Sequence, residues 1–314
     1  MRAQERNRYE RKKVATRVVI VERYKQLFRA LNPVICKYLT TRQILELWDC
    51  KTPWEIDAAQ RALVHLFDAE YLDRPKEQRK TPNNRSKNLV YQRTDKAARH
   101  VGERNVLAHR SNSFPHELVT DFFFSFPLLY WAKHVPGFKL TTTLKLMNGT
   151  VIETEKGDFQ LPLSTRESKD PFKIDGVRFD TTPMVIGNGE NIVFIPGIQT
   201  DRNTENFSSK TTYKPTLARH IDDIMRLIKS GKLRDHYSFK AMLFPILCTH
   251  RAHMDGAKKY LLENHGPRRD ILFKCVPDLI ELEHFPPIAS DLIDAPWERV
   301  GHPNFDLKTL SEVL

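Results

Sequence analysis

Acidic and amide side chains at the ends of two predicted strands are the residues best suited to chemistry. Asp175 comes just ahead of the strand GVRF, and the apolar strand NIVFIPGI is followed by Gln199 and Asp201, with Lys210 further along. Oxygen ligands of this kind hold Mg²⁺, which activates water and stabilises a phosphate under attack, while a lysine supports the charge. The pattern predicts a metal-dependent nuclease site, with Asp175 and Asp201 as metal ligands. The other interpretation is that both acids only form turns and caps.

The elements that would position these residues follow Pro136. Strands rich in β-branched and aromatic residues are separated by glycine turns, and then helices and strands alternate. This order predicts a mixed sheet with crossover helices, and thus an α/β domain of the restriction-endonuclease type over residues 111–276. Residues 277–314, rich in proline and acids, are expected to form a C-terminal tail on the surface. The strands are expected at FKLTTTLKLM, GTVIETE, GVRFDTTPMVIG, NIVFIPGIQ, FKAMLFPILCTH and DILFKCV, and the helices at TLARHIDDIMRLIKSGKL and AHMDGAKKYLLENH.

The first third of the chain has the periodicity of three helices and two strands. Apolar residues at helical spacing predict helices over about 18–31, 41–48 and 54–71. The segments YLDRP and NLVYQRT then alternate as strands do, and the charged segment between them is too long for a tight hairpin. We therefore expect a winged helix over residues 18–110, which makes the chain α+β overall. A basic arm, residues 1–17, precedes it and would either order on nucleic acid or only add solubility.

Cations and amides within this region are candidates for contact with duplex DNA. Gln60 and Arg61 on the third predicted helix would face a major groove, and the charged wing would lie along the phosphate backbone or enter a minor groove. The same fold also serves as a protein-docking module. The expected DNA contacts are Arg42, Gln60, Arg61, Arg74, Lys76, Arg79, Lys80, Arg85 and Lys87.

The net charge of +11 belongs to this region. Residues 1–110 hold 25 Lys and Arg against 13 Asp and Glu, or +12, which leaves 25 against 26, or −1, for the remainder. A polyanionic partner for the first third is the direct implication. No apolar run approaches the ~20 residues of a membrane span, and no secretory signal begins the chain, so we expect a cytoplasmic protein.

Other chemical patterns are weaker. The four cysteines lie far apart, with no spacing typical of a zinc ribbon or a disulfide framework, which favours a reducing compartment. His250 and His253 follow the strand FKAMLFPILC without further ligands and are expected to face solvent. No phosphate-binding loop of the Gly-x4-Gly-Lys-Ser/Thr type occurs, so no nucleotide cofactor is expected.

Taken together, the segments IDGVRF, IQTDRNTEN and FKAMLFPILCTHR behind a winged helix resemble the replication-relaxation proteins of plasmids and phages, over roughly residues 20–275. These are related to mobilisation relaxases with an endonuclease-like domain. The resemblance implies that Asp175 matches the family's first acid, that Asp201-Arg202 and Thr204-Glu205 match its second motif, and that Lys210 lies near its lysine. Ile174 replaces the family's proline. Gln199 replaces its leading glutamate and brings no charge, which implies weakened binding of Mg²⁺.

Three functions follow as hypotheses. The first is a DNA-binding protein of a plasmid, phage or other mobile element, in a bacterial cell or a phage-infected host, with a weakened endonuclease-like domain. It would act in replication, mobilisation or transcription control. The second is a DNA nicking enzyme that depends on Mg²⁺. The third is a virion or replisome module that docks proteins. A homodimer is plausible because winged helices often bind DNA as pairs.

Overall fold

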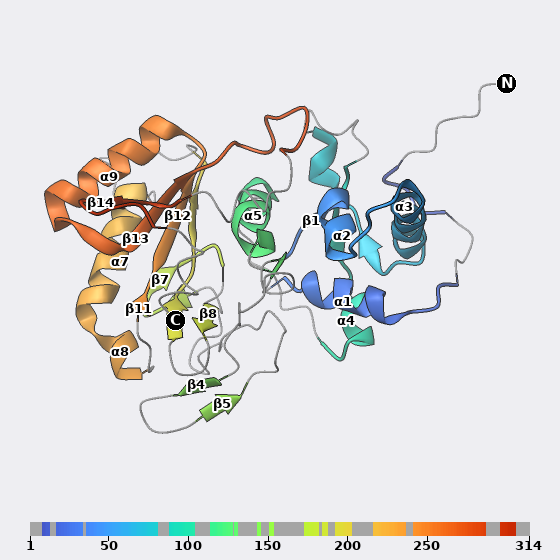
Figure 1. The fold of residues 1–314 in the computed structure, drawn as a ribbon, viewed down its shortest axis with the longest axis horizontal. Helices are drawn as coiled ribbons and strands as arrows, with labels where there is room; N and C mark the ends of the chain where they lie inside the picture. The colour runs from blue at the N-terminus through green and yellow to red at the C-terminus, as the bar shows by residue number, and fades with distance from the viewer. Residues whose placement is uncertain are drawn as a thin grey trace. The chain divides into compact units, whose positions relative to one another are not determined.

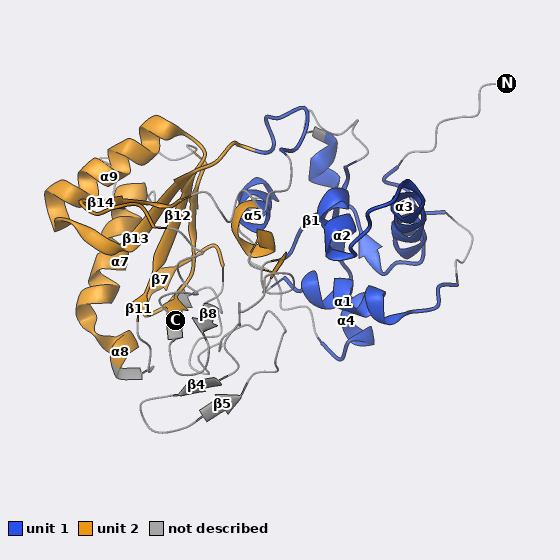
Figure 2. Cartoon of the chain, in the orientation of Figure 1, with its two compact units in different colours: residues 1–122, 279–288 blue, residues 123–278, 289–314 orange. Residues whose placement is uncertain are grey.

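The structure is a computed structural model of mixed α/β class, and it places two compact units. Unit 1 comprises residues 1–122 and 279–288, and unit 2 comprises residues 123–278 and 289–314 (Figure 2). The structure describes the placement of part of the chain. The described residues are 8–12, 17–33, 36–80, 88–103, 114–127, 129–130, 143–145, 151–153, 173–181, 184–187, 192–202, 216–236, 241–286 and 296–305.

Unit 1 combines short helices, among them α1 to α4 (Figure 1), with a three-stranded antiparallel sheet of order β1-β3-β2. Polar caps set the starts of its two central helices. Thr40 and Gln43 form a capping box at α2, and Thr52 and Glu55 form another at α3, with a proline in the first turn. The helices are α1 Glu22–Ala30, α2 Thr41–Leu47, α3 Pro53–Asp68, α4 Asp95–His100 and α5 Phe114–Thr120, and the strands are β1 Leu39–Thr40, β2 Leu72–Asp73 and β3 Val90–Arg93.

The predicted helices and strands of the first third are present with small shifts at their ends. Val19 is 76% exposed and lies ahead of α1, so the first helix is shorter than its apolar pattern suggests. A 3-10 helix, Lys76–Lys80, begins the charged segment between β2 and β3. Part of the basic arm is ordered: Arg11 donates through Nε to the carbonyl of Phe67 at 3.0 Å. Residues 8–12 thus lie against the end of α3.

Unit 1 extends beyond residue 110 because α5 is bonded to it. Lys37 Nζ donates to Glu117 at 2.6 Å, and the backbone N–H of Tyr38 donates to the Asp121 carboxylate at 2.8 Å. A π-helical turn, Asp121–Ser125, carries the chain from unit 1 into unit 2. The boundary at Phe122 therefore lies about one helix later than the sequence suggests.

Unit 2 is built on a mixed sheet. Strands β10, β12 and β13 are parallel, β14 is antiparallel to β13, and a second sheet has the order β11-β9-β8. The two sheets are continuous through the chain, since Leu243 joins β11 to β12 and donates to the carbonyl of Phe194 at 2.9 Å. The strands are β4 Thr143–Lys145, β5 Val151–Glu153, β6 Lys173–Ile174, β7 Val177–Arg178, β8 Met184–Gly187, β9 Ile192–Ile195, β10 Gln199–Asp201, β11 Ala241–Met242, β12 Phe244–Cys248, β13 Arg268–Cys275 and β14 Glu298–Val300.

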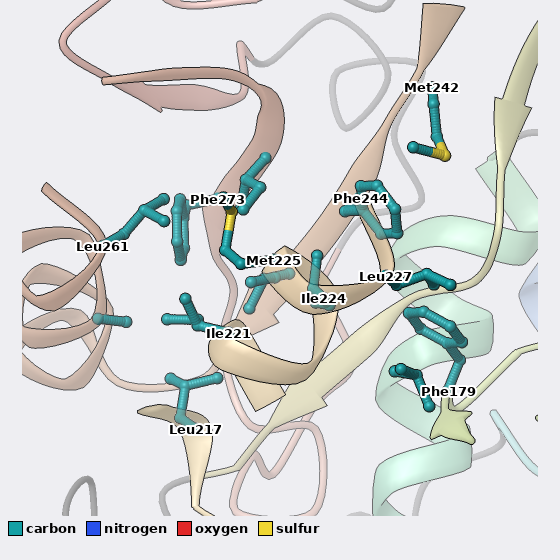
Figure 3. Packing of buried hydrophobic residues seen from close by; sticks show 14 of the residues in the cluster. Phe179, Leu217, Ile221, Ile224, Met225, Leu227, Met242, Phe244, Leu261 and Phe273 are labelled. Carbon is teal, nitrogen blue, oxygen red and sulfur yellow. The ribbon is translucent and has the colours of Figure 1, made fainter. Parts of the chain in front are cut away.

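Helices α7 Leu217–Ser230 and α9 Arg251–His265 connect the parallel strands, and α8 Lys232–His236 follows α7. The apolar face of α7 packs into the core of the unit, where Ile221, Ile224 and Met225 meet Phe244 and Phe273 (Figure 3). Gly231 ends α7 with φ of 71°, a left-handed cap that glycine adopts without steric cost.

The proline and acid content of residues 277–314 predicts a tail on the surface. The structure instead gives parts of this segment a place in both units. Residues 279–288 belong to unit 1, and Glu298–Val300 form a strand of the unit 2 sheet. Trp297 is 1% exposed and Phe285 is 8% exposed. These aromatic residues are too sparse to show a hydrophobic period, which is why the sequence does not reveal them as core. None of the helices in the described part of the chain has the length and apolar composition of a membrane span.

One stability prediction follows from Glu46 on α2. Partial burial raises the pKa of its carboxyl from 4.5 to about 7, against the opposing effect of Arg42. The folded state thus holds this proton more tightly than the unfolded state does. Its contribution to stability is complete below pH 4.5 and is lost as the pH rises through about 7.

We expect Glu46→Gln to reduce the fall in the free energy of unfolding between about pH 5 and about pH 8, measured by urea denaturation. Glu263→Gln, which changes an exposed glutamate on α9, is the control and should retain the wild-type pH dependence. If Glu46→Gln retained the wild-type pH profile, the raised pKa of Glu46 would be contradicted.

Candidate functional site

The exposed face of α3 presents a tryptophan and charged residues at helical spacing. The Trp54 side chain is 74% exposed, and Arg61 and His65 are also exposed. Arg61 Nη1 lies 2.7 Å from Asp57 Oδ2, and both of these side chains are 61% exposed. An exposed ion pair four residues apart on a helix adds only about 0.3–0.5 kcal/mol, so Arg61 can exchange this partner for another at small cost.

The start of α2 and the middle of α3 share a shallow cavity of about 330 Å³ within unit 1. Arg42 is exposed at the start of α2, and Gln60 is half-buried. The backbone N–H of Arg42 donates to the side chain of Asn88 at 2.9 Å, which ties α2 to the residues before β3. The cavity thus brings two of the predicted DNA contacts together. Its lining residues are Thr41, Arg42, Leu45, Gln60, Asn88, His284 and Phe285.

Two cations of the predicted wing are exposed in the 3-10 helix after β2. Lys76 and Arg79 reach solvent, and the Arg79 guanidinium lies 4.6 Å from the ring centre of Tyr9. Lys80 ends this helix, and its side chain lies outside the described atoms. Arg85 and Lys87 lie outside the described residues.

Arg74 is a structural residue, and its prediction as a DNA contact is wrong. It is 6% exposed, and its guanidinium lies 4.1 Å from the ring centre of Phe67 and 5.2 Å from that of Tyr91. It also donates to the Tyr91 hydroxyl at 3.2 Å and to the carbonyl of Arg8. A cation stacked between rings and bonded on the inside of the unit is not available to a phosphate.

The structure does not bring Asp175 and Asp201 together. Asp175 lies in the turn between β6 and β7 with φ of 45°, and Lys232, which follows α7, lies 2.8 Å from its carboxylate. Asp201 acts electrostatically on His220 in the first turn of α7. The two acids are therefore associated with opposite ends of a 14-residue helix, which is about 20 Å long.

Asp201 instead contacts His253, in the first turn of α9. Asp201 is 5% exposed, the His253 side chain is 11% exposed, and His253 Nδ1 is hydrogen-bonded to the Asp201 carboxylate. The expectation that His253 faces solvent is wrong. The position of His253 could have indicated this contact. His253 lies about one helical turn after β12, where a side chain can reach the end of the neighbouring parallel strand.

Asp201, His253 and His220 lie at the carboxyl ends of the parallel strands, where α/β sheets commonly bind ligands. Burial lowers the pKa of His220, against the opposing charges of Asp223 and Asp201, so its imidazole is neutral at pH 7. Gln199 is half-buried on β10, opposite Ile246 of β12. Lys210 lies outside the described residues.

The described residues do not assemble the predicted Mg²⁺ site. Mg²⁺ requires oxygen ligands in near-octahedral geometry, and Asp201 is engaged with a histidine while Asp175 is remote from it. The same part of the chain contains no group of three or more His, Cys, Asp or Glu side chains placed to hold a metal ion.

Two further features of this sheet edge are structural. Arg202 forms a bidentate pair with Asp278, with Nη2 to Oδ2 at 2.7 Å and Nε to Oδ1 at 3.3 Å, and both side chains are 9% exposed. Burial raises the pKa of the Cys248 thiol, and the neighbouring Asp201 charge raises it further. Cys248 therefore has little thiolate character at neutral pH and is a poor nucleophile.

Comparison with protein-family models, with curated proteins and with solved structures found no match for this chain.

We expect Asp278→Ala to lower the free energy of unfolding of unit 2 by about 3–5 kcal/mol, because it leaves the buried Arg202 guanidinium without its partner. Urea denaturation measures the change. Asp223→Ala is the matched control: its partner Arg226 is 68% exposed, and the loss should stay below about 1 kcal/mol. Equal losses of the free energy of unfolding in the two variants would show that the buried Arg202–Asp278 pair stabilises the fold no more than an exposed ion pair does.

Proposed function

We propose that this protein binds duplex DNA through unit 1, and that unit 1 is a winged helix. The observation that carries the proposal is the order of elements, α1-β1-α2-α3-β2-β3, with the antiparallel sheet order β1-β3-β2. In this arrangement α2 and α3 are the helix-turn-helix, and α3 is the recognition helix that enters the major groove. The segment between β2 and β3 is the wing.

The surface chemistry of unit 1 supports DNA as the partner. Residues 1–110 have a net charge of +12, and residues 111–314 have a net charge of −1. Arg42, at the start of α2, and Lys76 and Arg79, after β2, are exposed cations that suit phosphate contacts. Arg61 and Gln60 on α3 are of the types that read base edges.

Unit 2 is proposed as an endonuclease-like scaffold without a complete nuclease site. A mixed sheet suits an endonuclease-like fold. Asp175 and Asp201, however, bind separate partners and do not form a joint metal site. Metal-dependent nicking stays a prediction, as does the protein-docking module. A homodimer, a place in a plasmid or phage and a cytoplasmic location likewise stay predictions, and the membership of the replication-relaxation family rests on the resemblance of short motifs.

The proposal predicts a salt-dependent affinity for duplex DNA that falls when cations of unit 1 are removed. One triple variant combines Arg42→Ala, Lys76→Ala and Arg79→Ala. Each lost phosphate contact should reduce the magnitude of the slope of log K against log salt by about 0.9, so this slope should be smaller by about 2.7 in the triple variant. Fluorescence anisotropy with a short duplex of mixed sequence measures both the affinity and the slope.

The matched control removes three exposed cations of unit 2, in Arg226→Ala, Arg234→Ala, Lys259→Ala. Its affinity and slope should stay close to those of the wild type. Absence of duplex binding at low salt, or an equal loss in both triple variants, would contradict a DNA-binding surface on unit 1.

A further inference from the structure

Trp54 is an exposed aromatic residue at the second position of α3. Its exposed fraction is 74%, and no other large exposed apolar side chain of the described chain lies on this helix. Its exposed companions on the helix are Pro53, Asp57, Arg61 and His65, and all of these except Pro53 are polar. Tryptophan and arginine are enriched at protein interfaces as well, so the choice of DNA as the partner rests on the positive charge of residues 1–110.

Trp54 and Arg61 point in nearly the same direction. Seven residues separate them, and at 100° per residue the two side chains differ by about 20° around the helix axis. Along the axis they are about 10.5 Å apart, which equals about three base-pair steps of 3.4 Å. A recognition helix contacts base edges with residues of its N-terminal part, and Trp54 is the second and Arg61 the ninth of the 16 residues of α3.

The two side chains suit different features of the major groove. An apolar side chain packs on the C5 methyl group of thymine, and an arginine donates two hydrogen bonds to O6 and N7 of guanine. The Asp57 carboxylate, 2.7 Å from the Arg61 guanidinium, adds an acceptor to this donor. Guanine presents acceptors and its paired cytosine presents the N4 amino donor, so the Arg61 and Asp57 pair is complementary to one G·C base pair.

We propose that Trp54 and Arg61 determine the sequence preference of this protein: Trp54 contacts a thymine methyl group, and Arg61 with Asp57 reads a G·C pair about three base pairs away. This inference rests on the proposed function, because it requires α3 to enter the major groove of duplex DNA. The positive charge of unit 1 supplies affinity that does not depend on sequence, and these three side chains add the discrimination.

The first experiment selects bound sequences from a random duplex library with the full-length protein, then sequences them. The wild type should enrich a thymine separated from a guanine by about three base-pair steps. Trp54→Ala should lose the thymine preference alone, and Arg61→Ala the guanine preference alone. Trp54→Phe, which keeps an apolar ring, should retain the thymine preference. Leu262→Ala removes an exposed apolar side chain of unit 2 and should leave the motif unchanged.

The second experiment replaces the selected thymine by uracil, which removes only the methyl group. The wild type should bind the uracil duplex about fourfold more weakly, the effect expected for one buried methyl group. Trp54→Ala should bind both duplexes equally. Circular dichroism and thermal unfolding establish that the variants are folded, which is expected because Trp54 is on the surface.

The outcomes separate this inference from the proposed function. Salt-dependent duplex binding with no effect of uracil, or with a thymine preference that survives in Trp54→Ala, overturns the role of Trp54 while DNA binding stands. A guanine preference that survives in Arg61→Ala overturns the role of Arg61. Absence of duplex binding by the wild type overturns both the inference and the proposed function.

Discussion

Burial of one face of α3 determines which of its side chains can form the proposed DNA-binding surface. Ala59, Leu63, Leu66 and Phe67 repeat at helical spacing and are almost completely buried. Because a helix is rigid, burying these side chains turns the opposite face, with Trp54 and Arg61, toward solvent. The Thr52–Glu55 capping box then determines where the helix begins and which residues occupy its first turn.

The same core determines which cations of unit 1 remain available for a ligand. Arg74 stacks on Phe67, and Arg93 is buried and donates to the carbonyl of Phe28 at 2.8 Å. Arg11 binds the end of α3. The charge of +12 counted over residues 1–110 therefore overstates the charge that faces solvent. The exposed cations that remain, such as Arg42 on α2, are the ones that the proposal assigns to phosphate.

The sequence predicts α3, β2 and β3 well because their apolar periods, caps and turns are local signals. It also predicts α7 and α9, whose apolar residues recur over several turns. It cannot show that Arg74 is buried or that His253 meets Asp201, since both depend on contacts between residues 7 to 52 positions apart. The pairing of Asp175 with Asp201 failed because both acids lie near strand ends, and the sequence does not show which end of the sheet each one occupies.

Hydroxyl-radical footprinting of the protein, free and bound to duplex DNA, can show whether α3 contacts DNA, because it reports the solvent contact of individual side chains. Trp54 on α3 and Leu262 on α9 are 74% and 47% exposed, and both should react in the free protein. Bound DNA is expected to protect Trp54 and to leave Leu262 unchanged. Protection of Leu262 without protection of Trp54, under conditions where DNA is bound, would contradict the proposed contact of α3 with DNA.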